Sequence, residues 1–399
     1  MTTSNGVNKS RSKYIYFDYA ATTPVDAEVL SAMEPYFKKK SGNPSSLHLM
    51  GQEARRAADD AREQMKNFLN ASSLREIIFT GSATEANNLA IFGVIKAMRY
   101  WPAKLPHIIT TAIEHKSALA PCQELEKKGE AEVTYLKPNK EGFINAEELR
   151  QALRPDTALV SVMYVNNEIG TIQPIAEISE IIKEYRKNNL KITPFFHCDA
   201  VQAAGFLDMD AQKLGVDLMV VSGHKIYGPK GIGALYVREG VKIQPLAYGG
   251  EQEYGIRPGT EAVSLIVGLG KAAEITARWK FDKNNLEKIL KLRNYLIDEL
   301  LKIPGIQLNG SRENRLPNNA NIALTGYNMD SLLINLFEKG ICVSSGAACG
   351  ARGRNPSYVI FAISGDRKRA ISSLRITLGR ETNKKEIDLF LEKLIGTLA

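Results

Sequence analysis

The sequence has little cysteine and lacks any long apolar run. Only four of its 399 residues are cysteine, and no hydrophobic stretch is long enough to span a bilayer or to form the centre of a secretory signal peptide. These absences argue against a disulfide-stabilised secreted protein and against a membrane protein, and they favour a reducing, cytoplasmic setting. With 44% hydrophobic and 24% charged residues, the composition is that of an ordinary globular protein of two or three domains.

A dominant charge of one sign is also lacking. The 52 basic and 44 acidic residues are intermixed, so the net charge of +8 indicates a solvated surface and does not favour direct nucleic-acid binding. The polar, basic residues 1–13 predict a disordered tail, with a transit peptide as the alternative. We find no internal repeat and no low-complexity tract.

What the sequence does contain is an alternation of short β-rich runs with helical periodicity. Expected strands lie at 76–80, 107–111, 158–165, 194–199, 217–222 and 233–237. Between them, stretches such as 177–188 repeat apolar residues with the spacing of a half-buried helix. This order predicts an α/β fold whose mainly parallel sheet has helices on both faces and binds ligands beyond the carboxyl ends of its strands.

The pattern changes after about residue 272. A long helical stretch at 284–302 follows, and the chain ends in another apolar helical stripe at 386–399. We therefore expect a second, smaller domain to begin there.

Lys225 lies in a glycine-rich loop directly after the expected strand 217–222. Desolvation and nearby positive charge would lower the pKa of its amine, which could then form a Schiff base with an aldehyde cofactor. The alternative is an exposed loop lysine.

Asp199 ends the expected strand 194–199, and Gln202 follows one helical turn later. A carboxylate in this place could hold the protonated ring nitrogen of such a cofactor, with Gln202 facing the same ligand. The alternative for Asp199 is the N-cap of a following helix.

Three further strand ends carry polar groups. Gly81, Ser82 and Thr84 precede an apolar helix, where free N–H groups make an anion site for a phosphate, although helix capping explains them equally. His115 could stack on a cofactor and move protons, or be an incidental loop histidine. Asn167 could donate to a cofactor hydroxyl, or serve an ordinary turn.

Several longer motifs resemble those of one enzyme family. They are "YFDYAATTP" (16–24), "GNPSS" (42–46), "VNNEIG" (165–170), "SGHKIYGPKGIGALYVR" (222–238), "SSGAAC" (344–349) and "SSLRITLGRET" (372–382). In this combination and order, over nearly the whole chain, the sequence resembles the cysteine desulfurases, which are members of the class V aminotransferase family of fold type I pyridoxal-phosphate enzymes.

This resemblance implies an architecture. A large α/β/α domain with a mainly parallel seven-stranded sheet would span residues 28–272. A smaller α+β domain would combine 14–27 with 273–399 and carry the catalytic cysteine loop, at about 344–356.

The resemblance also implies a cofactor site for pyridoxal 5′-phosphate (PLP), and no metal. Lys225 would bind the cofactor covalently, Asp199 would pair with the pyridine nitrogen, and His115 would stack on the ring and assist proton transfer. Gln202 and Asn167 would lie near the ring hydroxyl. Thr84, Ser222 and His224 would bind the phosphate, and Ala83 is a further cofactor-binding position.

Two further matches concern the substrate and the neighbouring subunit. Thr260 would reach the phosphate bound by a second subunit, which implies a homodimer with shared active sites. Arg375 would bind the carboxylate of the substrate, a task suited to a planar two-pronged donor, and its alternative is a surface ion pair. The implied reaction converts L-cysteine to L-alanine and leaves the sulfur on the enzyme as a persulfide.

The resemblance assigns that persulfide to Cys349, which lies in a glycine-containing loop and aligns with the family nucleophile. The other cysteines, Cys122, Cys198 and Cys342, lie in helical, strand and apolar contexts that favour packing. The spacing from Cys349 to Pro356 matches the group of desulfurases with a longer, mobile loop.

Two arginines in the cysteine loop depart from the family pattern. Arg352 and Arg354 could favour the thiolate, hold the loop by ion pairs or attract an acidic sulfur acceptor.

The identity of that acceptor protein is left open by the sequence. An iron–sulfur scaffold, a tRNA-thiolation enzyme and a DNA-sulfur-modification system are all compatible, and an end at "LIGTLA" argues against the first. The competing interpretations are a selenocysteine lyase, another class V enzyme, or a non-catalytic scaffold of the same fold.

Overall fold

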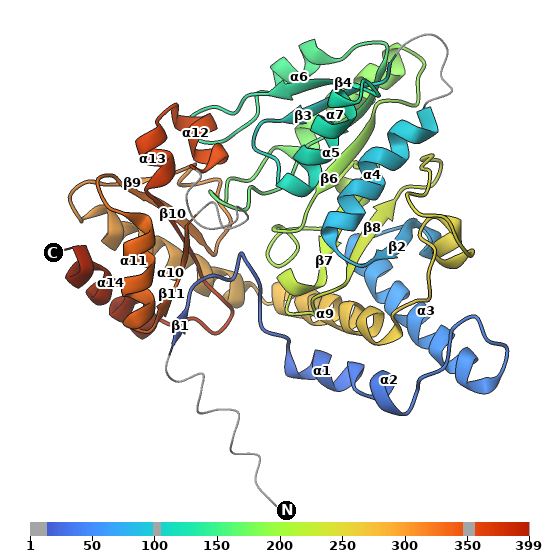
Figure 1. Cartoon of the computed structure of the whole chain (residues 1–399), viewed down its shortest axis with the longest axis horizontal. Helices are drawn as coiled ribbons and strands as arrows, with labels where there is room; N and C mark the ends of the chain where they lie inside the picture. Colours follow the sequence, from blue (N-terminus) through green and yellow to red (C-terminus); the bar gives the residue numbers. More distant parts are fainter. Residues whose placement is uncertain (1–13, 99–104, 346–355, 399) are drawn as a thin grey trace, which may run out of the picture.

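The structure is a computed structural model that describes residues 14–98, 105–345 and 356–398. Within these ranges the chain forms a seven-stranded sheet and a four-stranded sheet, each packed against helices (Figure 1). The predicted tail at 1–13, and Cys349, Arg352 and Arg354 of the predicted cysteine loop, lie outside the described residues.

The larger sheet confirms the predicted α/β fold. Its strands are β2 (Ile77–Thr80), β3 (His107–Thr111), β4 (Glu132–Leu136), β5 (Thr157–Ser161), β6 (Phe195–Asp199), β7 (Leu218–Ser222) and β8 (Gly233–Val237). Their spatial order is β2-β8-β7-β6-β5-β3-β4. Only β8 runs against its neighbours, so the carboxyl ends of the other six meet at one edge of the sheet.

Two strand predictions differ from the structure for physical reasons. The strand expected at 158–165 ends at Ser161, because its pairing with β3 stops there. The N–H groups of Val162 and Tyr164 still donate to carbonyls of β6, and Met163 lines the cavity described below. Strand β4 was not predicted, because its edge position leaves only its last residue buried and its sequence "EVTYL" lacks a clear apolar run.

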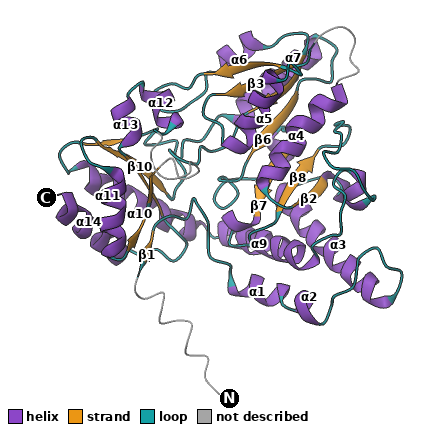
Figure 2. Ribbon diagram, viewed as in Figure 1, coloured by secondary structure: helices purple, strands orange, loops and turns teal. Residues whose placement is uncertain are grey.

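Helices cover both faces of this sheet, as predicted (Figure 2). One face packs against residues of α1 (Ala27–Met33), α3 (Leu49–Leu69), α6 (Ala146–Ala152), α7 (Ile175–Asn188), α8 (Ala211–Leu214) and α9 (Val263–Phe281). The other face packs against α4 (Ala83–Met98) and α5 (Lys116–Lys127). A short helix, α2 (Pro35–Lys38), follows α1.

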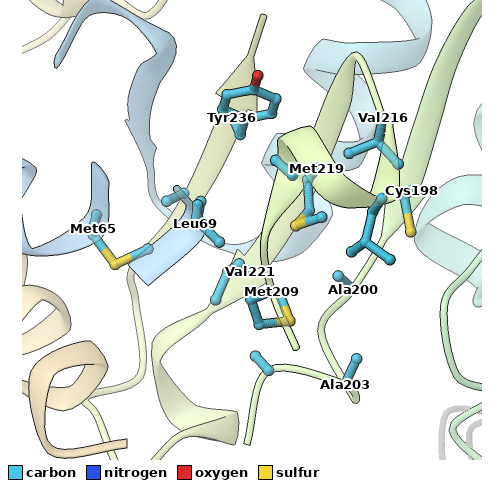
Figure 3. Packing of buried hydrophobic residues seen from close by; sticks show 14 of the residues in the cluster. Met65, Leu69, Cys198, Ala200, Ala203, Met209, Val216, Met219, Val221 and Tyr236 are labelled. Atoms are coloured by element: carbon cyan, nitrogen blue, oxygen red, sulfur yellow. The ribbon is translucent and has the colours of Figure 1, made fainter. Parts of the chain in front are cut away.

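Alternate residues of each central strand belong to the two cores on opposite faces of the sheet. In β7, Met219 and Val221 belong to the core on the α3 and α9 side, whereas Leu218 and Val220 belong to the core on the α4 and α5 side. Figure 3 shows the first of these cores, where Met219 and Val221 lie among other buried side chains of the sheet and the helices. Successive side chains of a strand point to opposite faces of the sheet. A strand whose two faces are both covered by helices is therefore apolar without interruption.

The remaining elements form the second unit. Its four-stranded sheet has the order β12-β13-β10-β9, from β9 (Ile306–Leu308), β10 (Asn319–Leu324), β12 (Ser344–Ser345) and β13 (Ser373–Thr377). A separate pair joins β1 (Ile15–Tyr16) to β11 (Ile341–Cys342). The helices are α10 (Lys283–Leu301), α11 (Met329–Glu338), α12 (Tyr358–Ser364), α13 (Arg367–Ile371) and α14 (Lys384–Leu398).

The predicted division of the chain at residue 272 falls inside α9, so a continuous helix, and not a loop, passes through it. Phe17, from the start of the described chain, is buried in the core between the second sheet and α10, α11 and α14. The division at 272 itself stays a prediction.

Candidate active site

A cavity of about 540 Å³ lies beyond the carboxyl ends of the strands of the large sheet. Segments following β2, β3, β5, β6 and β7 contribute to its wall, and Ala21 and Thr22 add a segment from near the start of the chain. Of the twelve predicted site residues, nine line it: Ala83, Thr84, His115, Asn167, Asp199, Gln202, Ser222, His224 and Lys225. The cavity lies where ligands bind in open α/β sheets.

Lys225 reaches the cavity from a short 3-10 turn, Gly223–Lys225, that directly follows β7. Its Nζ donates to the backbone carbonyls of Ala20 and Ala21, at 2.9 Å in the second case. The carbonyl of Ala20 also accepts from Nε2 of Gln202 at 3.1 Å. The alternative of an exposed loop lysine is therefore wrong, because the amine is turned inward and held by the segment at 20–21.

Asp199 is the last residue of β6, and the residue is 5% exposed. Oδ1 accepts from the backbone N–H of Val201 at 3.1 Å, and Oδ2 accepts from the side chain of Asn87 at 2.7 Å. Turns, and not a helix, follow Asp199, so both the helix N-cap alternative and the placing of Gln202 one helical turn later are wrong. The carboxylate is a buried group oriented from two sides.

His115 follows β3 and is the N-cap of α5, where Nδ1 accepts from the backbone N–H of Ser117 at 3.2 Å. The Oγ of Ser117 lies 2.7 Å from the same nitrogen. Because Nδ1 accepts a backbone N–H, it carries no proton of its own, and the proton of the neutral ring belongs on Nε2.

The start of α4 also lines the cavity, with Ser82, Ala83 and Thr84. The side chain of Ser82 accepts from the N–H of Glu85 at 3.1 Å, so capping and cavity lining occur together. His224 lies on the same cavity, and burial, with the nearby charges of Lys225 and Lys230, lowers its pKa to about 4. An anion here meets N–H groups, hydroxyls and a lysine amine.

The adjacent residues Asn166 and Asn167 have different roles. The side chain of Asn166 accepts from the N–H groups of Glu168 and Ile169, at 2.9 and 3.0 Å, which is turn chemistry. Asn167 instead lines the cavity, and its Oδ1 is buried without a hydrogen-bond partner.

Arg375 lies on β13 of the second sheet, 3% exposed, and is not among the residues that line the cavity. It donates to the carboxylate of Asp18 at 2.9 Å and to the backbone carbonyl of Asn167 at 3.0 Å. The Nε atom is buried without a partner. The alternative of a surface ion pair is wrong, because Arg375 is buried behind Asn167 of the cavity wall and the side chain of its partner Asp18 is only 20% exposed.

Thr260 is exposed and does not line this cavity. It follows Arg257, whose guanidinium contacts Glu85 of α4 at 2.8 Å. The start of α4 and the Thr260 segment are therefore linked within one chain.

The three described cysteines are poor nucleophiles. Cys122 and Cys198 are fully buried, which confirms that they pack in the core, and burial raises the pKa of Cys122 to about 12 and that of Cys198 well above its usual range. Cys342 is half-buried on a second cavity of about 550 Å³, and burial also raises its pKa. Cys349 lies outside the described residues.

Sequence reasoning missed several residues at the site. Asn87 is fully buried in α4, and Ser117, Met163 and Lys230 line the cavity. Asn87 could have been noticed in the sequence, because it is a polar residue on the apolar face of "EANNLAIFGV". Nothing in the sequence beyond the matched motif at 16–24 indicates the role of the carbonyls at 20–21.

Within residues 14–98, 105–345 and 356–398, no cluster of histidine, cysteine, aspartate or glutamate could hold a metal ion. In the same ranges, no helix has the length and apolar character needed to cross a membrane.

Comparison with known proteins places this architecture in one family. The model of the family "Aminotransferase class-V" matches residues 15–390, and the chain belongs to that family of PLP-dependent enzymes. A solved structure titled "NIFS-LIKE PROTEIN" is 37% identical and covers 96% of this chain and 99% of its own, with a TM-score of 0.88.

Within the family the chain is a cysteine desulfurase, as its motifs predicted. It is 47% identical to "Cysteine desulfurase IscS" of Dictyoglomus turgidum over 381 residues, which cover 95% of this chain and 93% of that protein. It is also similar to a structure titled "SspA in complex with cysteine", at 38% identity over 91% of this chain and 98% of that one, with a TM-score of 0.78.

Proposed function

We propose that this chain binds PLP in the strand-end cavity, converts L-cysteine to L-alanine there, and receives the sulfur on Cys349 as a persulfide. One observation carries the cofactor proposal: the amine of Lys225 and the buried carboxylate of Asp199 line the same cavity of about 540 Å³. An amine for an aldehyde and a carboxylate for a ring nitrogen are the two groups that PLP requires of a protein.

The other groups on the cavity fit the remaining parts of PLP. Thr84, Ser222 and His224, with the start of α4, would hold the phosphate. Asn167 would contact the ring hydroxyl, which would give its buried Oδ1 a partner. Gln202 would lie beside it, and His115 would stack on the ring.

PLP bound here would supply an electron sink for the bond broken at the Cα of cysteine. The amine of Lys225 would act as the base that removes the Cα proton of the substrate, and it would later return a proton to the product. Its contact with the carbonyl of Ala21 holds it at the cavity wall. His115 would hold or move a second proton through Nε2, since its Nδ1 is engaged by the start of α5.

Arg375 would bind the substrate carboxylate through its unpartnered Nε and the edge of its guanidinium. This role needs the guanidinium to gain access past the wall formed by Asn167, whose carbonyl now accepts from it. The ion pair with Asp18 would hold the arginine in the correct orientation.

The thiolate of Cys349 would attack the sulfur of the substrate. An S–S bond forms as the C–S bond breaks, and the electron pair of the broken bond stays on the three-carbon product, which leaves as L-alanine after protonation. The described cysteines support this assignment, because burial disfavours the thiolate of Cys122, Cys198 and Cys342.

A homodimer is also proposed, with Thr260 reaching the phosphate of the neighbouring subunit. Its support is that Thr260 is exposed on a segment held to α4 by Arg257 and Glu85. A cytoplasmic location and a sulfur-acceptor protein complete the proposal. The acceptor can be identified by loading the enzyme with cysteine carrying labelled sulfur and finding which proteins of the native cytosol receive it.

The persulfide assignment is tested with Cys349→Ser and the matched variant Cys342→Ser. We expect Cys349→Ser to lose alanine production from L-cysteine while retaining the visible band of bound PLP, and Cys342→Ser to keep both. Mass spectrometry should find an added sulfur on the peptide containing Cys349. Undiminished alanine production by Cys349→Ser would overturn the assignment.

A further inference from the structure

Asn87 links two strand ends that are far apart in the sequence. Its side chain, fully buried in α4, donates to Oδ2 of Asp199 at 2.7 Å and to Oγ of Ser117 at 2.8 Å. Its Oδ1 lies 3.0 Å from Nε2 of His197. Both hydrogens and the oxygen of the amide are therefore engaged.

The direction of these bonds determines protonation states. Both hydrogens of Asn87 are donated, so its Oδ1 accepts and Nε2 of His197 carries a proton. Nδ1 of His197 then accepts from the hydroxyl of Ser161 at 2.9 Å. Burial lowers the pKa of His197 to about 4, in agreement with a neutral ring.

The other branch leads to His115. Oγ of Ser117 accepts from Asn87, and its own hydrogen is left to donate to Nδ1 of His115 at 2.7 Å. The same nitrogen accepts the backbone N–H of Ser117. One amide thus orients the carboxylate at the end of β6 and, through one hydroxyl, the imidazole after β3.

We propose that Asn87 is a positioning residue that couples the orientation of Asp199 to that of the His115 ring through the hydroxyl of Ser117. The proposal rests on the proposed function, because it gives these two groups their roles toward PLP. Asn87 does not line the cavity and acts only through its neighbours. A polar residue needed only to fill the core would not require an acceptor on β6 and a relay to α5 at once.

A loosened Asp199 would hold the ring-nitrogen proton of PLP less firmly. The ring would then withdraw fewer electrons from the nitrogen of Lys225, so the pH at which the visible band titrates would rise. A lost hydrogen bond to a charged group also corresponds to about a tenfold weaker binding of PLP.

The test compares Asn87→Ala with Ser161→Ala. The control removes an equally buried hydrogen bond from the far side of His197, and the described contacts of Ser161 do not include Asp199 or Ser117. Three quantities are measured in the full-length protein: the dissociation constant of PLP, the pH at which the visible band titrates, and the ring resonances of His115 by NMR without PLP. Should Asn87→Ala fail to fold, Asn87→Ser serves for the same comparison.

We expect Asn87→Ala to bind PLP about tenfold more weakly, to have a visible band that titrates at higher pH, and to show shifted ring resonances of His115. Ser161→Ala should match the wild type in all three. Equal behaviour of the two variants would overturn the role of Asn87. If the wild type itself fails to bind PLP, the proposed function fails instead, and the NMR result still reports whether Asn87 governs His115.

Discussion

The two sheets carry their site residues in different ways. In the seven-stranded sheet, Asp199, Lys225 and His115 lie at or just after strand ends, and each is held by neighbours on the cavity wall. In the four-stranded sheet, Arg375 lies within β13 and contacts Asp18 and Asn167, which are both distant in sequence. The strand ends bring the first group to one edge of the sheet, whereas the contact of Arg375 with Asn167 exists only once the two units pack together.

The largest effect is expected at Lys225, at a strand end of the seven-stranded sheet. We expect Lys225→Ala to reduce kcat roughly a thousandfold or more and to abolish the visible band, because it removes the amine that would bind PLP. Lys230→Ala is the matched control, since Lys230 lines the same cavity and should leave the band in place. A band that survives in Lys225→Ala would place the covalent attachment elsewhere.

Arg375 should behave differently, because its contact with the carbonyl of Asn167 joins the two units. Arg375→Gln leaves the carboxylate of Asp18 without its partner, and the free energy of unfolding should fall by about 3 kcal/mol. The value of kcat/KM for cysteine should fall roughly a hundredfold.

The double variant Asp18→Asn, Arg375→Gln separates these two effects. Denaturant unfolding should show that it recovers part of the stability, because no buried charge is left unpaired. Steady-state kinetics should show no recovery of kcat/KM. Recovery of both would mean that Arg375 is a structural residue only.

A smaller effect, on how stability depends on pH, distinguishes the cavity end of β3 from its opposite end. Just beyond the cavity end, burial raises the pKa of Glu114 to about 8. The unfolded chain releases this proton near pH 4.5, so the stability that the neutral carboxyl contributes is lost as the pH rises from 4.5 toward 8. In Glu114→Gln, the free energy of unfolding should fall by about 2 kcal/mol less over this pH range, as measured by denaturant unfolding at several pH values.

At the opposite end, burial lowers the pKa of His107 to about 4, and its ring nitrogens lie 2.9 Å from the hydroxyls of Thr157 and Thr134. The unfolded chain takes up a proton near pH 6.5, so this contribution to stability is lost as the pH falls from 6.5 toward 4. In His107→Gln, the free energy of unfolding should fall by about 2 kcal/mol less between pH 6.5 and pH 4, and its dependence on pH above 6.5 should be unchanged. An unaltered acid slope would show that the ring is not neutral in the folded state.

Sequence reasoning reached the large sheet and most of the cavity because both leave local signals. Apolar runs marked β3, β6 and β7, and polar residues at their ends marked Lys225, Asp199 and His115. It missed β4, whose edge position removes the apolar pattern. It also placed Gln202 on a helix, because nothing in "DAVQAAG" distinguishes a helix from successive turns.

By itself, the sequence determined the class of fold, the strand ends at which ligands bind, and the residue types presented there. The reason is that periodicity and turn chemistry act over a few neighbouring residues. Only the tertiary structure decided that Asn87 joins Asp199 to Ser117, that Ala20 and Ala21 hold Lys225, and that Arg375 is buried against Asp18. These contacts join residues separated by up to 357 positions, and they form only when segments that are distant in the sequence pack together.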